Sequence, residues 1–135
     1  MSLGYGGWCY IVAQDEQTVI FQYGSYNLND STYRNAERVC DGTIIIDKES
    51  LVEPEIHEKL KRFSNGKKKL IVKRIVVDVS YKELFENGKI QIQNSKNCWR
   101  TTVDGNDYIV WHLIWKIFSE YQRNGTIPEK VTYNV

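Results

Sequence analysis

The sequence predicts an α+β fold, with a single mixed or antiparallel sheet, an N-terminal hairpin, a long C-terminal helix and two shorter helices. Strand and helix patterns mix without the steady βαβ rhythm of a parallel sheet. Two strand patterns near the N-terminus follow each other closely enough to require antiparallel pairing. A chain of 135 residues can bury a core without disulfide or metal support. We therefore expect residues 1–135 to form one globular domain.

The stretch GGWCYIVAQDEQTVIFQYG predicts the N-terminal hairpin. Aromatic and β-branched residues suit a pleated surface, and they predominate in residues 8–13 and 18–23, on either side of a polar link at 14–17. Both faces carry apolar side chains, so we expect cover on each side. The Tyr-, Asn- and Ser-rich segment 23–40 predicts a loop with room for a short helix over 33–39, and residues 42–47 predict a short strand.

Residues 53–66 predict the first short helix. Pro54 suits the first helical position, where its missing N–H costs nothing, and Asn65-Gly66 is a typical helix end. Three apolar residues fall on one helical stripe: Ile56, Leu60 and Phe63. A strand pattern follows over residues 68–79. Residues 80–88 predict the second short helix, because Ser80 and Glu83 have the spacing of a capping box.

The C-terminal third predicts strands at both ends and a long helix between them. Strands are expected over residues 89–93, 98–103 and 130–135. The helix is expected from an N-cap at Asp107 to Arg123, ended by Asn124-Gly125. Its apolar residues cover an arc of about 200°, twice the ~100° of an ordinary one-sided helix. A second surface, from this chain or from another copy, should therefore cover it.

Composition limits the classes of function. Eighteen basic residues against seventeen acidic give a net charge of +1, lower than is typical of DNA-binding domains, which argues against a nucleic-acid partner. Three widely spaced cysteines without a CxxC pair predict reduced thiols and a cytoplasmic protein. The first residues lack the basic start and apolar run typical of a signal peptide, and no apolar run approaches bilayer length, so we expect no membrane partner. No motif predicts a cofactor or a metal.

The aromatic residues supply the preferred binding surface. Tyrosine and tryptophan offer a large rigid contact area, and neighbouring Ser, Gly and Asn add adaptable hydrogen bonds. The candidate contact residues are Trp8, Tyr10, Tyr23, Tyr26, Tyr33, Trp99 and Trp115. The primary hypothesis is a non-catalytic binding or protein-interaction module that uses this aromatic-rich surface. Its partner would be another protein or a second copy, giving a homodimer.

Other interpretations remain open for several of these residues. Trp115 lies at the edge of the apolar arc of the long C-terminal helix, where core packing is favoured over partner contact. His112 falls on the polar arc of the same helix, which predicts a solvated side chain. Residues 59–74 hold eight basic and no acidic side chains. A solvated face explains them most simply, and a weak anionic ligand at three adjacent lysines is the alternative: Lys67, Lys68 and Lys69.

Catalysis is the competing hypothesis. A small hydrolase or transferase would use Cys98 or a carboxylate as its reactive group, with His57 or His112 as the partner. No catalytic signature surrounds any of these residues, and a free cysteine packs as a small apolar side chain. The sequence therefore favours a protein without catalytic activity.

Overall fold

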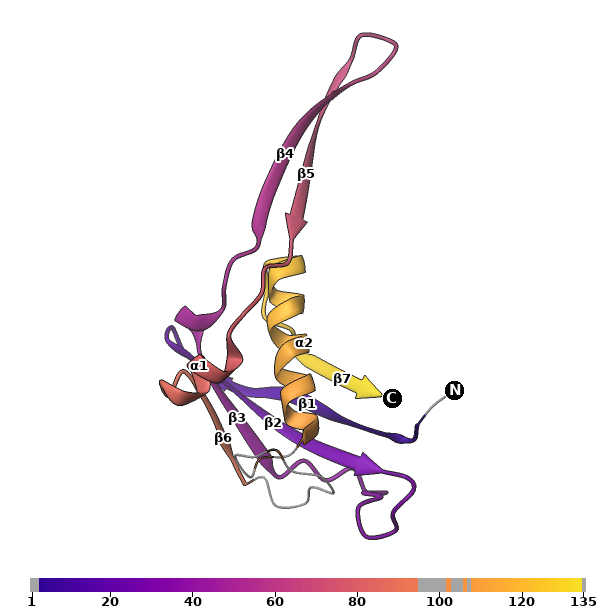
Figure 1. Ribbon diagram of the computed structural model, residues 1–135, viewed down its shortest axis with the longest axis vertical. Coiled ribbons are helices and arrows are strands. Elements are labelled where there is room, and N and C mark those ends of the chain that lie inside the picture. The colour runs from indigo at the N-terminus through magenta and orange to yellow at the C-terminus, as the bar shows by residue number, and fades with distance from the viewer. Residues whose placement is uncertain (1–2, 95–101, 103–105, 107, 135) are drawn as a thin grey trace.

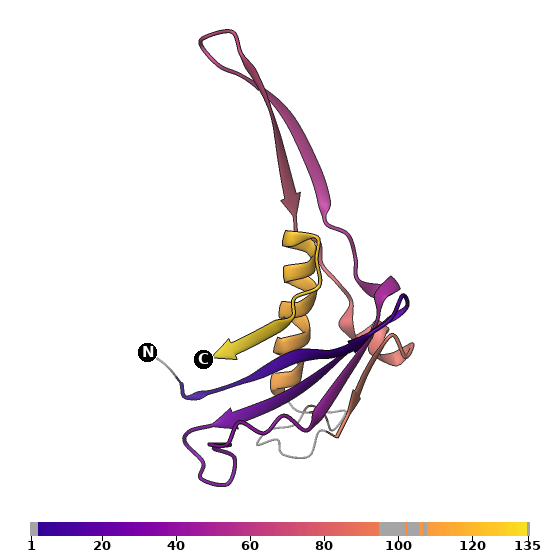
Figure 2. The same ribbon diagram turned by 180° about the vertical axis from the view of Figure 1, so that it is seen from behind.

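The computed structural model describes residues 3–94, 102, 106 and 108–134. The fold is α+β, as predicted, and it has two parts (Figure 1). One part is a body made of a five-stranded antiparallel sheet and its covering helix. The other is a separate two-stranded ribbon, which we call the arm (residues 55–75), and it projects away from the body in both views (Figures 1 and 2).

The sheet of the body has the strand order β6-β3-β2-β1-β7, and every neighbouring pair is antiparallel. The predicted N-terminal hairpin is confirmed, since β1 and β2 pair along their lengths with a bulge between Ile11 and Ala13. The short strand after the loop, the strand near residue 90 and the terminal strand are also present. The strands are β1 (Tyr5–Gln14), β2 (Thr18–Asn27), β3 (Gly42–Asp47), β6 (Ile90–Gln93) and β7 (Lys130–Asn134).

The long helix α2 (Tyr108–Asn124) lies on one face of this sheet and packs against β1, β2 and β7. Strand residues that alternate toward the helix are fully buried, including Cys9, Phe21 and Ile44. The helix buries Leu113, Ile117 and their apolar neighbours against them. The core therefore lies between one helix and one face of the sheet, and among the described residues no helix lies on the other sheet face (Figure 2).

The predicted helix over residues 53–66 is wrong. The segment forms β4 (Glu55–Arg62), which pairs with β5 (Lys68–Ile75) in an antiparallel hairpin. Leu60 follows Ile56 by four positions, an even offset, so the two share a strand face as well as a helix stripe. Asn65-Gly66 forms the hairpin turn, in which the Phe63 N–H donates to the Lys67 carbonyl at 2.8 Å. The same dipeptide suits a helix end and a tight turn.

The rest of the chain departs from the predicted elements in smaller ways. The second short helix is confirmed as α1 (Tyr81–Glu86), and a 3₁₀ turn spans η1 (Lys48–Ser50). Residues 33–39 contain turns and no helix. The described residues thus hold two α-helices and two sheets, where three helices and one sheet were predicted. Asp107 and most of the predicted strand over 98–103 lie outside the described residues.

Candidate functional site

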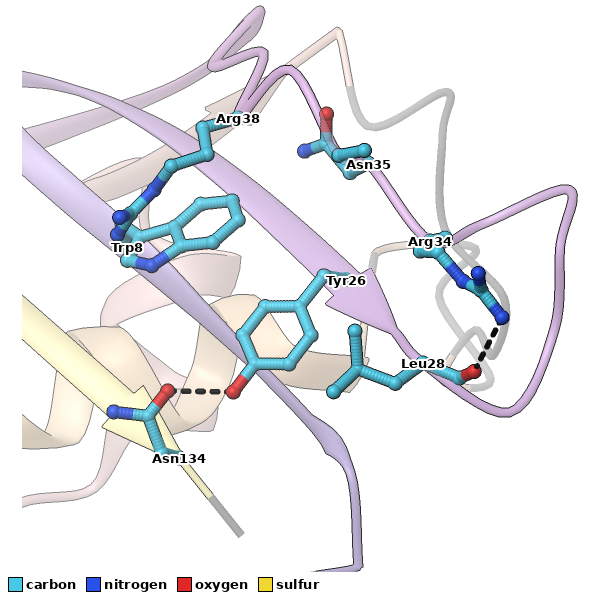
Figure 3. A pocket seen from close by; sticks show the side chains of 8 residues that line it. Trp8, Tyr26, Leu28, Arg34, Asn35, Arg38 and Asn134 are labelled. Carbon is cyan, nitrogen blue, oxygen red and sulfur yellow. Dashed lines mark hydrogen bonds between the residues drawn. The ribbon is translucent and has the colours of Figure 1, made fainter.

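Two surfaces are candidates for binding: an aromatic group on the open face of the sheet, and the arm. In the aromatic group, Trp8 and Tyr26 stack with ring centroids 5.1 Å apart and planes inclined by 26°. Their neighbour Cys9 is buried beneath α2, so Trp8 points to the opposite sheet face. The guanidinium carbon of Arg38 lies 4.6 Å from the Trp8 ring centroid, within cation–π range (Figure 3).

These rings border an open hollow of about 400 Å³ (Figure 3). The Tyr26 hydroxyl donates to Asn134 Oδ1 at 2.6 Å, and Arg34 Nη2 donates to the Leu28 carbonyl at 3.3 Å. A flat aromatic wall next to two guanidinium groups suits a planar or anionic group of a partner. We call the group of Trp8, Tyr26 and Arg38 the aromatic shelf.

The predicted aromatic residues do not gather at one place. Tyr10 shares the face of the aromatic shelf, and its hydroxyl donates to Gln22 Oε1 at 2.9 Å. Tyr23 is instead 2% exposed in the core, because it occupies an inward-facing position of β2, so its expected surface role is corrected. Tyr33 lies in the loop after β2 and borders a separate small hollow. Trp99 lies outside the described residues.

The helix residues also differ from expectation. Trp115 is 48% exposed on α2, so it is not a core residue, and it lies on a different element from the aromatic shelf. Trp111 is half-buried, and its cover comes from this chain, because Phe85 of α1 meets it edge-on at 5.4 Å between ring centroids. His112 was expected in solvent, yet it stacks on Tyr133 of β7 with centroids 4.3 Å apart. Its partial burial lowers its pKa.

The two candidate catalytic histidines lie on different elements of the fold. His57 lies on the arm, where its Nε2 is 2.8 Å from Glu55 Oε1 and both side chains are exposed. His112 lies on α2, and Cys98 is outside the described residues. Burial raises the pKa of Cys9 to about 12, which keeps it a thiol. Within the described residues, His, Cys, Asp and Glu side chains nowhere gather in a group of three or more that suits a metal ion.

The arm is exposed along its whole length, and strand pairing divides its side chains between two faces. One face, here called the apolar face, carries four aliphatic side chains that are each 52–57% exposed. Leu60 and Leu70 are direct cross-strand partners on it. Arg62 and Lys68 form the next pair on this face toward the tip. The aliphatic residues of the apolar face are Ile56, Leu60, Leu70 and Val72.

The opposite side, here called the basic face, carries four lysines. Lys61 and Lys69 are directly paired across the strands, which places like charges opposite each other. Such pairs destabilise an isolated hairpin. Ile71, 39% exposed, lies between Lys69 and Lys73 on this face, and Ile75, 36% exposed, lies at the base of the arm opposite Glu55. The lysines of the basic face are Lys59, Lys61, Lys69 and Lys73.

Charge is segregated between the arm and the rest of the chain. Residues 55–75 hold eight basic and two acidic side chains, a net charge of +6. The remaining residues hold ten basic and fifteen acidic side chains, a net charge of −5. Of the eight basic side chains, only Arg74 has an ion pair within the described part of the chain, with Glu53 Oε2 at 3.9 Å. The net charge of +1 therefore conceals a strongly basic projection on an acidic body.

The base of the arm is fixed to the C-terminal turn of α2. Gln122 is 1% exposed; its Oε1 accepts from the Val77 N–H at 2.7 Å and its Nε2 donates to the Val77 carbonyl at 3.1 Å. Arg74 Nε donates to the Gln122 carbonyl at 2.9 Å, where the helix dipole favours a cation. Glu53, which precedes β4, accepts from the Tyr121 hydroxyl at 2.7 Å. Both strands of the arm are thus attached to the helix end.

Comparisons with protein-family models, with curated proteins and with solved structures gave no match for this chain. None of the helices in the described parts of the chain has both the length and the apolar character needed to cross a membrane.

Proposed function

We propose that this chain is a non-catalytic binding module and that the arm is its main contact element. The observation that carries this proposal is the uncovered apolar face, where four aliphatic side chains are each more than half exposed. An isolated two-stranded hairpin is only marginally stable in water. Contiguous exposed apolar side chains are typical of protein–protein contact sites. A partner protein that covers Leu60, Leu70 and their neighbours would bury these apolar side chains and would stabilise the hairpin.

The attachment of the arm supports the same conclusion. A disordered projection loses conformational entropy when it binds a partner. An element that is already ordered and held at its base loses less, because it has less freedom to give up. The two Gln122–Val77 hydrogen bonds and the Arg74 contact hold the arm at its base. They make it a preorganised contact element that extends from the body.

The aromatic shelf is a second, smaller contact region in this proposal. Trp8 and Tyr26 present a stacked aromatic wall, and Arg38 adds a cation beside it. Tyrosine, tryptophan and arginine are the residues enriched at binding hot spots. The enzyme alternative has less support, because the His57–Glu55 pair lies on the exposed arm.

The proposal is tested with a shortened arm. His57 and Lys73 are direct cross-strand partners, so replacing residues 58–72 with Asn-Gly joins them through a two-residue turn and keeps Arg74 in place. The full chain and the shortened variant serve as tagged baits in the cells that make the protein, and co-purifying proteins are quantified by mass spectrometry. We expect partners that the full chain retains and the shortened variant loses. Identical sets from two folded baits would refute the proposal.

A further inference from the structure

The basic side chains of the arm surround it and lack internal neutralisation. Four lysines occupy the basic face, while Arg62 and Lys68 flank the tip on the other face. Within the described residues, none of these six side chains makes an ion pair with an acidic group. Like-charge pairs such as Lys61–Lys69 raise the energy of the free hairpin. A polyanion with closely spaced negative charges would neutralise all six basic side chains at once.

The shape of the arm narrows the choice of polyanion. Its strands of eight residues are about 26 Å long at ~3.3 Å per residue, and two strands lie ~5 Å apart. The major groove of B-form DNA, ~12 Å wide, admits a two-stranded ribbon. The major groove of A-form RNA is deep and narrow, and side chains do not reach its bases. The arm therefore matches duplex DNA better than duplex RNA.

The charge of the body favours an approach by the arm alone. The body carries a net charge of −5, so it is repelled by phosphates that attract the arm. The arm projects away from the body in both views, which gives a long rigid partner access to it (Figures 1 and 2).

We propose that the arm binds double-stranded DNA with its basic face directed into the major groove, where Lys59, Lys61, Lys69 and Lys73 contact phosphates and base edges. This inference rests on the proposed function only in treating the arm as a contact element. The apolar face points away from the DNA and stays available to a protein. A second copy of the chain is the competing occupant, because its acidic body also complements the arm.

The test is a fluorescence-anisotropy titration of the full chain with a labelled 20-base-pair DNA duplex at 50, 100 and 200 mM NaCl. Four to six phosphate contacts predict a slope of log K against log salt of about −4 to −5. Over the fourfold salt range this is a loss of affinity of roughly 200- to 1000-fold. Duplex RNA and single-stranded DNA of equal length are titrated in parallel, and each should bind more weakly.

Two matched variants test the basic face. The first replaces Lys59, Lys61 and Lys69 with Gln, and the control replaces Lys82, Arg123 and Lys130 of the body with Gln, so that both lose three positive charges. We expect the first variant to bind at least about tenfold more weakly at 100 mM salt, with a slope reduced by about 3. The control should keep its slope. Both should retain the circular dichroism spectrum of the unaltered chain.

Several results would overturn the inference. No binding at 50 mM salt would exclude DNA as the partner, and an equal loss in the two variants would assign binding to net charge instead of the basic face. If duplex RNA or single-stranded DNA bound as tightly as duplex DNA, binding of the arm in the major groove of DNA would be excluded. Sedimentation velocity that shows a dimer dissociated by the basic-face substitutions would assign the arm to a second copy. None of these results contradicts a protein contact at the apolar face, so failure here is distinguishable from failure of the proposed function.

Discussion

The attachment of the arm gives a quantitative prediction for Gln122→Ala. The substitution removes a buried side chain that makes two hydrogen bonds to the backbone of Val77, at 2.7 and 3.1 Å. Leaving a buried donor or acceptor unsatisfied costs about 1–3 kcal/mol for each group. Val77 is only half-buried, so water reaches it and the cost lies toward the lower end of that range. With the lost packing of the side chain, we expect about 2–3 kcal/mol less free energy of unfolding.

Urea denaturation followed by circular dichroism measures this change, and amide hydrogen exchange locates it. The Val77 amide should lose protection, because its acceptor is gone. Gln91→Ala is the matched control: Gln91 is exposed, and its side chain makes a single long hydrogen bond, 3.4 Å to the Gly88 carbonyl. Its effect should stay within about 0.5 kcal/mol. A loss below 1 kcal/mol for Gln122→Ala, with Val77 still protected, would refute the attachment of the arm by this side chain.

Two further predictions follow from the buried titratable groups. Burial holds the pKa of His112 below its ordinary value of 6.5, so the unfolded chain binds protons more readily than the folded one. Stability should therefore fall as the pH drops through 6.5, and His112→Gln should flatten this part of the urea-denaturation profile; an unchanged profile would argue against burial of the ring. The Cys9 thiol, with its pKa raised to about 12, should resist iodoacetamide at pH 8.5 in the folded chain and react in urea, as read by mass spectrometry. Equal rates in both conditions would contradict its burial.

The sequence predicted the body of the protein better than the arm. The elements of the body have clear local signals in the sequence, and the structure forms the elements that these signals predict. The signals are the alternation in β1 and β2, the Asn-Gly ends of α1 and α2, and the short alternating pattern of β6. The helix predicted over residues 53–66 failed because Ile56 and Leu60 satisfy both periods and Asn65-Gly66 suits both a helix end and a hairpin turn. The β-branched run of β5 on the far side of that turn was the signal for a hairpin.

The binding surfaces were predicted only in part. Alternation alone separates Trp8 from Cys9, and it would also have placed Tyr23 inward, because Tyr23 shares a strand face with the apolar Val19 and Phe21. The net charge of +1 hides the basic arm, whereas the run of eight basic residues over 59–74 indicates it; the sequence did not show how strand pairing divides these charges between two faces. The contact of His112 with Tyr133 joins residues distant in sequence, and no local pattern shows it.

Site-specific photo-cross-linking tests the central claim, that the arm is the contact element, most directly. A photoreactive residue is placed at Leu60 on the apolar face, at Lys61 on the basic face, or at Gln91, which is exposed on the body. After irradiation in the cells that make the protein, we expect protein adducts at position 60, DNA adducts at position 61 and background at position 91. Background levels at both arm positions, or equal adducts at position 91, would contradict the claim.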